Sequence, residues 1–145
     1  MNPSSTAPGK NYLLVTGILL VIFSVYSLIG VIGALVVSLA SLSLGAIGVI
    51  LLLATLVAAA IVIVDFVAGI MGILNREKLE KAKTCMGLGV AMLVIAGLNI
   101  IVSMSSGSFS FFSSLCGLVL PILYTIGASK NKAAAQQQQQ QNVNF

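Results

Sequence analysis

Residues 46–74 read AIGVILLLATLVAAAIVIVDFVAGIMGIL, and this stretch holds one charged residue, Asp65. A helix crosses the hydrocarbon core of a membrane in about 20 residues. The stretch is longer than that, and its apolar side chains run on without the alternation of a half-buried strand. The sequence therefore predicts a transmembrane helix at 46–74.

The composition of the whole chain agrees with this local pattern. Of its 145 residues, 59% are hydrophobic and 7% are charged, and the mean hydropathy is +1.14. Soluble domains average about 25% charged residues. So few charges exclude a soluble enzyme, a nucleic-acid-binding domain and a disordered protein. A polytopic membrane protein remains.

The charged residues leave two uncharged tracts, Asn11–Val64 and Thr84–Ser129. Each is more than twice as long as the ~20 residues of one crossing. Near its middle each tract has serine and glycine residues that favour a turn: Ser38, Ser41, Ser43 and Gly45 in the first, and Ser103, Ser105, Ser106, Gly107 and Ser108 in the second. We therefore expect an all-α bundle of four transmembrane helices with short outer turns, at 12–37, 46–74, 84–104 and 109–128.

The basic residues predict the orientation of these helices. All seven Lys and Arg lie in the N-terminal segment, the middle loop or the C-terminal segment. Because basic loops stay in the cytoplasm, both termini are expected there, with the chain in the plasma (inner) membrane. The basic face is expected to attract anionic lipid headgroups, and nothing points to nucleic acid. A signal peptide cleaved after Ser38-Leu39-Ala40 is disfavoured, because the apolar run exceeds the 7–15 residues of a signal core.

The ends of the chain differ from the 11–129 transmembrane domain in composition. Residues 1–10 are polar, and residues 130–145 include six consecutive glutamines, Gln136–Gln141. Such segments bury too little apolar surface to offset their ordering entropy. We expect two disordered cytoplasmic tails, with a short helical extension through Ala133–Ala135 as the alternative for the start of the second.

Glycine is the main packing signal. In lipid, helices associate by close backbone approach at small residues. Pro121 interrupts the last span and removes the helical donor to the Gly117 carbonyl, so it is a candidate hinge. The glycine pairs that predict tight packing, within the chain or with a second copy or partner, are Gly30 and Gly33, Gly45 and Gly48, and Gly69 and Gly72.

Asp65 is the most informative single residue. It lies roughly 15 Å along the helix from Asn75, near the middle of the bilayer. An ionised carboxylate there costs at least about 2.5 kcal/mol, so Asp65 should face the bundle and be protonated or hydrogen-bonded. Ranking polar residues by depth gives Tyr124, Ser24 and Asn99 as its candidate partners.

The chain lacks the sequence patterns of an enzyme or a metal protein. It has no histidine and no phosphate-binding, nucleotide-binding or zinc motif. Cys85 and Cys116 are expected at depths that differ by roughly 15–20 Å, too far apart for a disulfide. We therefore expect no catalytic residue, metal or cofactor.

Three apolar segments carry a resemblance to a known group of proteins. They are LLVTGILLVIF at 13–23, GIMGILN at 69–75 with KAKTC at 81–85, and LVLPILYTIG at 118–127. In these the chain resembles small four-helix membrane proteins of Gram-positive gut-type bacteria. The resemblance implies a bacterial plasma membrane and implies no activity.

Two functions fit this sequence. In the first, the protein acts without catalysis, by packing its helices against a second copy or a partner in the membrane, and Asp65 is a polar lock between helices. In the second, Asp65 is the site of a small proton- or cation-coupled transporter or channel. An Asp65 sealed against Tyr124 or Ser24 would favour the first function, and an Asp65 on a water-accessible cavity would favour the second.

Overall fold

The structure is a computed structural model that describes residues 7–105 and 111–143. These residues form four long helices, α1 (Lys10–Ala40), α2 (Ala46–Leu74), α3 (Ala82–Ser105) and α4 (Phe111–Val143). Two short 3₁₀ turns, η1 (Ser41–Leu44) and η2 (Leu79–Lys81), lie in the connections. The described residues contain no strand, so the expected all-α fold is confirmed.

Three described segments are long and apolar enough to cross a membrane: Lys10–Leu44, Ala46–Leu74 and Leu79–Ser105. They contain the predicted spans at 12–37, 46–74 and 84–104. The fourth crossing, expected in α4, stays a prediction. Its expected first residues and the turn residues Ser106, Gly107 and Ser108 lie outside the described residues.

The connection between α1 and α2 shows why the chain turns where it does. Ser38 and Ser41 donate their hydroxyls to carbonyls of the preceding helical turn, and η1 then ends at Gly45. Gly45 has φ +68°, a conformation that side chains with a Cβ disfavour. Gly45 therefore shapes the turn. A Cβ built on it would meet no atom within 4 Å, so the structure shows no close helix packing at this predicted packing residue.

The C-terminal segment differs from the prediction. Residues from Lys130 to Val143 continue α4 as a helix, whereas the sequence predicted a disordered tail. Alanine, glutamine and lysine all have high helix propensity. Extending an existing helix also avoids the cost of nucleating a new one.

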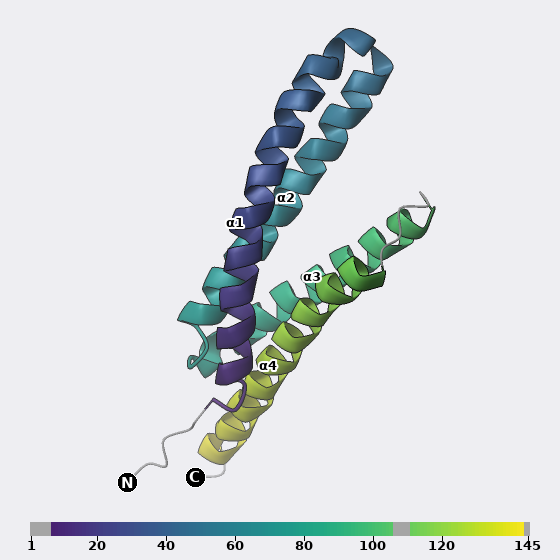
Figure 1. Ribbon diagram of the computed structural model, residues 1–145. Helices are drawn as coiled ribbons and strands as arrows, with labels where there is room; N and C mark the ends of the chain where they lie inside the picture. The colour runs from purple at the N-terminus through teal and green to yellow at the C-terminus, as the bar shows by residue number, and fades with distance from the viewer. Residues whose placement is uncertain (1–6, 106–110, 144–145) are drawn as a thin grey trace.

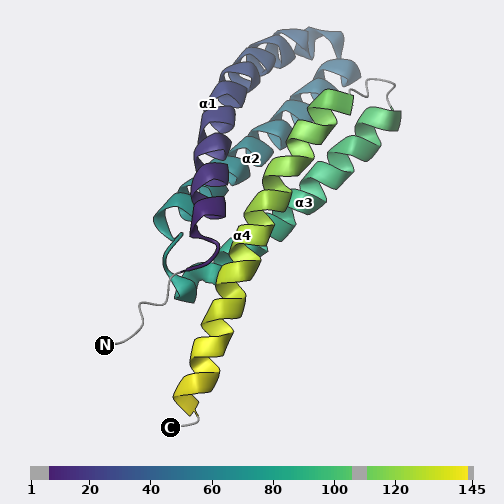
Figure 2. The same ribbon diagram turned by 60° about the horizontal axis from the view of Figure 1, so that its bottom comes forward.

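The four helices form two hairpins that meet at one end (Figures 1 and 2). Helices α1 and α2 pack together, as do α3 and α4, and α1 also packs on α4. Toward the turn between α1 and α2 the hairpins diverge, so that Figure 1 shows a V. We call the closed end the base. It contains the buried core, formed by Leu13, Leu20, Ala68, Cys85, Met92, Tyr124 and Ala128.

Glycines allow the helices of the base to approach closely. A Cβ built on Gly17 would lie 2.8 Å from the carbonyl oxygen of Gly69, and one on Gly69 would lie 2.9 Å from that of Gly17. A Cβ on Gly72 would lie 2.6 Å from the Tyr124 ring. At the opposite end of the hairpin, beside the turn between α1 and α2, Gly48 packs closely on the backbone of Ser41. Small residues thus set the helix contacts here, as expected in lipid.

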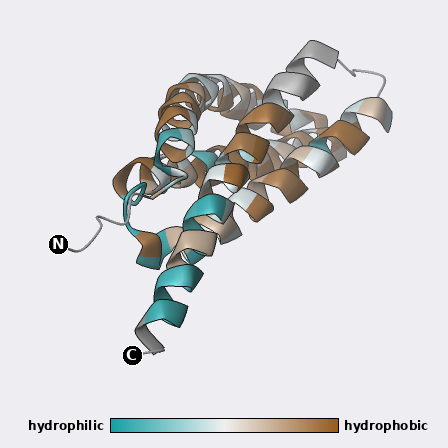
Figure 3. Cartoon of the chain, turned by 90° about the horizontal axis from the view of Figure 1, so that it is seen from below, coloured by the Kyte–Doolittle hydropathy of each residue, from teal (hydrophilic) through white to brown (hydrophobic). Residues whose placement is uncertain are grey.

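Away from the base, large apolar side chains are exposed along α1, α2 and α3. Tyr26 is 76% exposed and Ile29 is 69% exposed, for example. Seen from below, hydrophilic residues gather at the base and along the projecting end of α4, while the helices are otherwise largely apolar (Figure 3). Water would not solvate such a surface, and a membrane would. The basic residues, from Lys10, the 76–83 connection, Lys130 and Lys132, all belong to the basal end.

Candidate functional site

A cleft of about 250 Å³ opens above the base, between α2, α3 and the first third of α4. Most of its lining is apolar. Its polar side chains come from two helices, with Asp65 on α2 and Asn99 and Ser103 on α3. Pro121 and Gly117 contribute from α4. The cleft therefore brings together residues from three helices at the point where the hairpins begin to separate.

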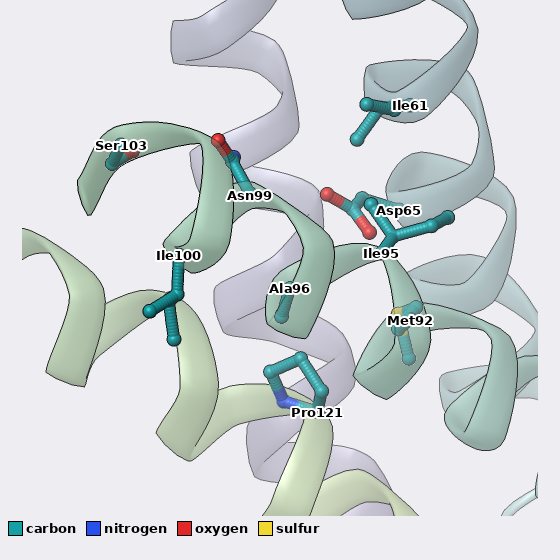
Figure 4. Close-up of a pocket in the computed structure, with 10 residues that line it drawn as sticks. Ile61, Asp65, Met92, Ile95, Ala96, Asn99, Ile100, Ser103 and Pro121 are labelled. Atoms are coloured by element: carbon teal, nitrogen blue, oxygen red, sulfur yellow. The ribbon is translucent and has the colours of Figure 1, made fainter. Parts of the chain in front are cut away.

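The carboxylate of Asp65 points into this cleft (Figure 4). The side chain is half-buried. Within the described part of the chain, it accepts no hydrogen bond and forms no ion pair. An acidic group at this depth would be expected to have a protein partner. Its lack of one indicates that water, a proton or a ligand satisfies it.

Asn99 is the one predicted partner that shares the cleft with Asp65. Figure 4 shows the Asp65 carboxylate of α2 directed toward α3, which carries Asn99, and both residues line the cleft. No hydrogen bond joins the two side chains. Ser103 lies one turn further along α3 and lines the same cleft. The two hairpins thus present polar groups to each other across a gap.

Tyr124 does not bind Asp65, in contrast to the prediction. Its hydroxyl donates a hydrogen bond of 2.9 Å to the main-chain carbonyl of Ala68, one turn closer to the base. The Tyr124 side chain is fully buried against Gly72 and Gly89. The ring fills the space those glycines leave, which fixes its hydroxyl below the level of Asp65. Tyr124 therefore ties α4 to α2 and closes the cleft at its basal side.

Ser24 also lies elsewhere than predicted. It is buried on α1, and its hydroxyl has no hydrogen-bond partner among the described residues. It lines a separate apolar cavity of about 150 Å³ with Val62, Ile63 and Phe66 of α2. Ser24 has the expected depth, but it packs on a different side of α2 from Asp65.

Pro121 lies inside α4, which continues as a helix on both sides of it. Its ring is buried and faces the cleft. Because proline has no N–H, the carbonyl four residues earlier, that of Gly117, loses its helical donor. The hinge role of Pro121 stays a prediction, but its place in the lining of the same cleft as Asp65 was not apparent from the sequence.

The base is closed by a polar contact that the sequence did not indicate. Asn131 is fully buried, and its side-chain oxygen accepts a 2.7 Å hydrogen bond from the Gly9 N–H. Its side-chain nitrogen donates a 2.9 Å bond to the carbonyl of Arg76. The neighbouring Lys130 ammonium lies 4.5 Å from the centre of the Tyr12 ring. Asn131 thus joins the start of α1, the end of α2 and α4, and we call this contact the basal clasp.

Gly30 and Gly33 are not used for packing inside the chain. Both lie on the exposed part of α1, and a Cβ on either would meet no atom within 4 Å. Gly17, Gly89 and Gly127, which the sequence analysis did not select, do pack closely on neighbouring helices. None of them belongs to a pair of glycines three residues apart, which is the spacing on which the prediction depended.

Comparison with protein-family models, curated proteins and solved structures finds no match for this chain. Residues 7–105 and 111–143 are helical apart from short connections, and three of their helices have the length and composition to span a membrane. The cleft and its residues are therefore the main indication of function.

Proposed function

We propose that this is a small multi-pass membrane protein that binds a proton or cation at Asp65 and passes it across the membrane. The observation that carries the proposal is the unpartnered Asp65 carboxylate in an open cleft, together with Asn99. A carboxylate that acted as a lock between helices would be sealed by donors from a neighbouring helix. The hydroxyl that was predicted to seal Asp65, that of Tyr124, is bonded to Ala68 instead.

The shape of the protein supports the same function. The cleft lies where the hairpins diverge, and the Tyr124 contact and the core close it at the base. This is the arrangement of a site open to one side and closed to the other. Passage would require the hairpins to separate at the base, which the Tyr124 hydrogen bond and the basal clasp now hold together.

The orientation and location belong to the same proposal. The three basic segments share the basal end, so the base would face the cytoplasm of a bacterial cell, next to anionic headgroups. The α4 helix would then make the fourth crossing, with both termini inside. The function is binding and passage without covalent chemistry, and it needs no resident cofactor.

The test is cation and proton flux into liposomes that contain the purified protein. Asp65→Asn keeps the size of the side chain and removes its charge, so we expect flux to fall to the level of empty liposomes. Ser24→Ala is the matched control, because Ser24 is a buried polar residue on the other side of α2. Equal flux in the wild type and Asp65→Asn would remove the basis of the proposal.

Assembly in the membrane is the second candidate function, because Gly30 and Gly33 lie on an open face of α1. For a monomer, replacing both by alanine should stabilise the helix by about 1–2 kcal/mol, since alanine is the better helix former by about 0.5–1 kcal/mol at each position. For an assembly through this face, the added methyl groups should instead weaken association. Crosslinking of the wild type and the double variant in native membranes measures association directly and so distinguishes a monomer from an assembly through this face. Unchanged oligomers in the double variant would exclude this face as the interface.

A further inference from the structure

We infer that the cleft coordinates a partly hydrated monovalent alkali cation through three oxygen donors. These are the Asp65 carboxylate, the Asn99 side-chain oxygen and the main-chain carbonyl of Gly117. The inference rests on the proposed function and specifies its ligand. All three residues line the same cleft, and each comes from a different helix.

Pro121 is the reason that the main-chain carbonyl oxygen of Gly117 can act as a cation ligand. A carbonyl inside a helix normally accepts the N–H of the residue four positions later. Position 121 has no N–H, so the Gly117 oxygen keeps its lone pairs available. Gly117 has no side chain to cover that oxygen, and a Cβ built there would meet no atom within 4 Å. Backbone carbonyls freed in this way are ligands of monovalent cations in membrane proteins.

The charge of the cleft selects a monovalent cation. Asp65 is the one charged residue of the lining, and the other donors are neutral. A divalent ion with all-protein ligands would need more carboxylates, and the described residues contain no group of three acidic, histidine or cysteine side chains. An anion would be repelled by Asp65. One negative charge with neutral oxygens matches one positive charge.

The size of the cleft fits an ion that keeps part of its hydration shell. The cleft of about 250 Å³ is several times the ~30 Å³ that one water occupies in the liquid. Protein oxygens from Asp65, Asn99 and Gly117 would supply part of the coordination, and water the remainder. The open upper side gives the ion a way in, while Met92 and Tyr124 block the way to the base.

The experiment measures thermal unfolding of the detergent-solubilised protein against Na⁺ or K⁺, with choline replacing the alkali cation at constant ionic strength. For the wild type we expect the midpoint to rise saturably with the alkali cation, and Asp65→Asn should abolish the rise. Pro121→Ala restores an N–H to the Gly117 oxygen, so the concentration for half-saturation should increase about tenfold, as expected for losing one ligand worth about 1.4 kcal/mol. Ile122→Ala, at the exposed next position, is the control and should bind like the wild type.

A second variant makes the result independent of changes in α4. Asn99 is exposed on α3, so Asn99→Leu should fold while losing the amide oxygen, with weaker cation binding. A wild-type midpoint that does not respond to either cation overturns the inference, as does wild-type affinity in Pro121→Ala and Asn99→Leu. Proton flux that depends on Asp65 without any cation response would overturn the cation site but keep the proposed function. Cation binding without flux would support the site and contradict passage.

Discussion

Asn131→Ala is expected to lower the free energy of unfolding by about 2–5 kcal/mol, because it removes both hydrogen bonds of the basal clasp. The Gly9 N–H and the Arg76 carbonyl would lose their side-chain partner. Each buried group left unsatisfied costs about 1–3 kcal/mol. The side chain is fully buried, so water would not replace it without disturbing the contact between α1 and α4.

Unfolding of the protein in detergent micelles by added denaturant would measure this loss. Gln137→Ala is the matched control, since Gln137 lies on the same helix and is exposed. Asn131→Asp keeps the acceptor for Gly9 but loses the donor to Arg76, so its stability should lie below the wild type as well. If Asn131→Ala were as stable as Gln137→Ala, the clasp would not hold the base together.

The sequence predicted the helices well, because length and polarity alone determine them in a lipid environment. The bounds of α2 match the predicted 46–74, and the serine–glycine turn at 41–45 lies where the charge-free tract was divided. The end of α4 was missed for a physical reason. The polar composition of residues 130–143 predicts a disordered tail when the segment is considered alone. In the structure these residues extend a helix that is already formed.

The candidate site was predicted only in part, because depth along a helix says nothing of direction around it. Ser24 and Tyr124 have suitable depths, yet they face other contacts. A better signal was present in α2. Asp65, Ala68, Gly69 and Gly72 are spaced by three or four residues and so share one side of the helix. Gly69 packs on α1, whereas Ala68 and Gly72 contact Tyr124 of α4. Only the second part of this pattern marks the side on which Asp65 faces the cleft.

Asn131 was missed because its surroundings in sequence are those of a solvated segment. It stands between Lys130 and Lys132 and before the alanines and glutamines. Only the meeting of α1, α2 and α4 at the base buries it. No periodicity within one helix carries that information, since the partners are 122 and 55 residues away in the chain.

Gly69→Leu should be as damaging as the loss of the clasp, with a destabilisation of about 3 kcal/mol or more. Even a Cβ at this position would lie 2.9 Å from the Gly17 carbonyl oxygen and 3.1 Å from the Leu20 Cβ. Backbone cannot move aside as a flexible side chain does, so α1 would have to shift away from α2. Overpacking of an interior commonly costs about 1–3 kcal/mol, and a whole leucine against a helix backbone belongs at or above the upper end.

The consequence extends to the cleft, because α2 carries Asp65 one turn from Gly69. Separation of α1 and α2 would also strain the hydrogen bond from the Tyr124 hydroxyl to the Ala68 carbonyl. The stabilisation of the protein by the cation should therefore weaken together with its overall stability. Gly87→Leu is the control for the added apolar bulk, since Gly87 is exposed on α3 and a Cβ there meets no atom within 4 Å. Unfolding in micelles should separate the two variants clearly. Equal stability of Gly69→Leu and Gly87→Leu would contradict the close contact of α1 and α2 on which the geometry of the base depends.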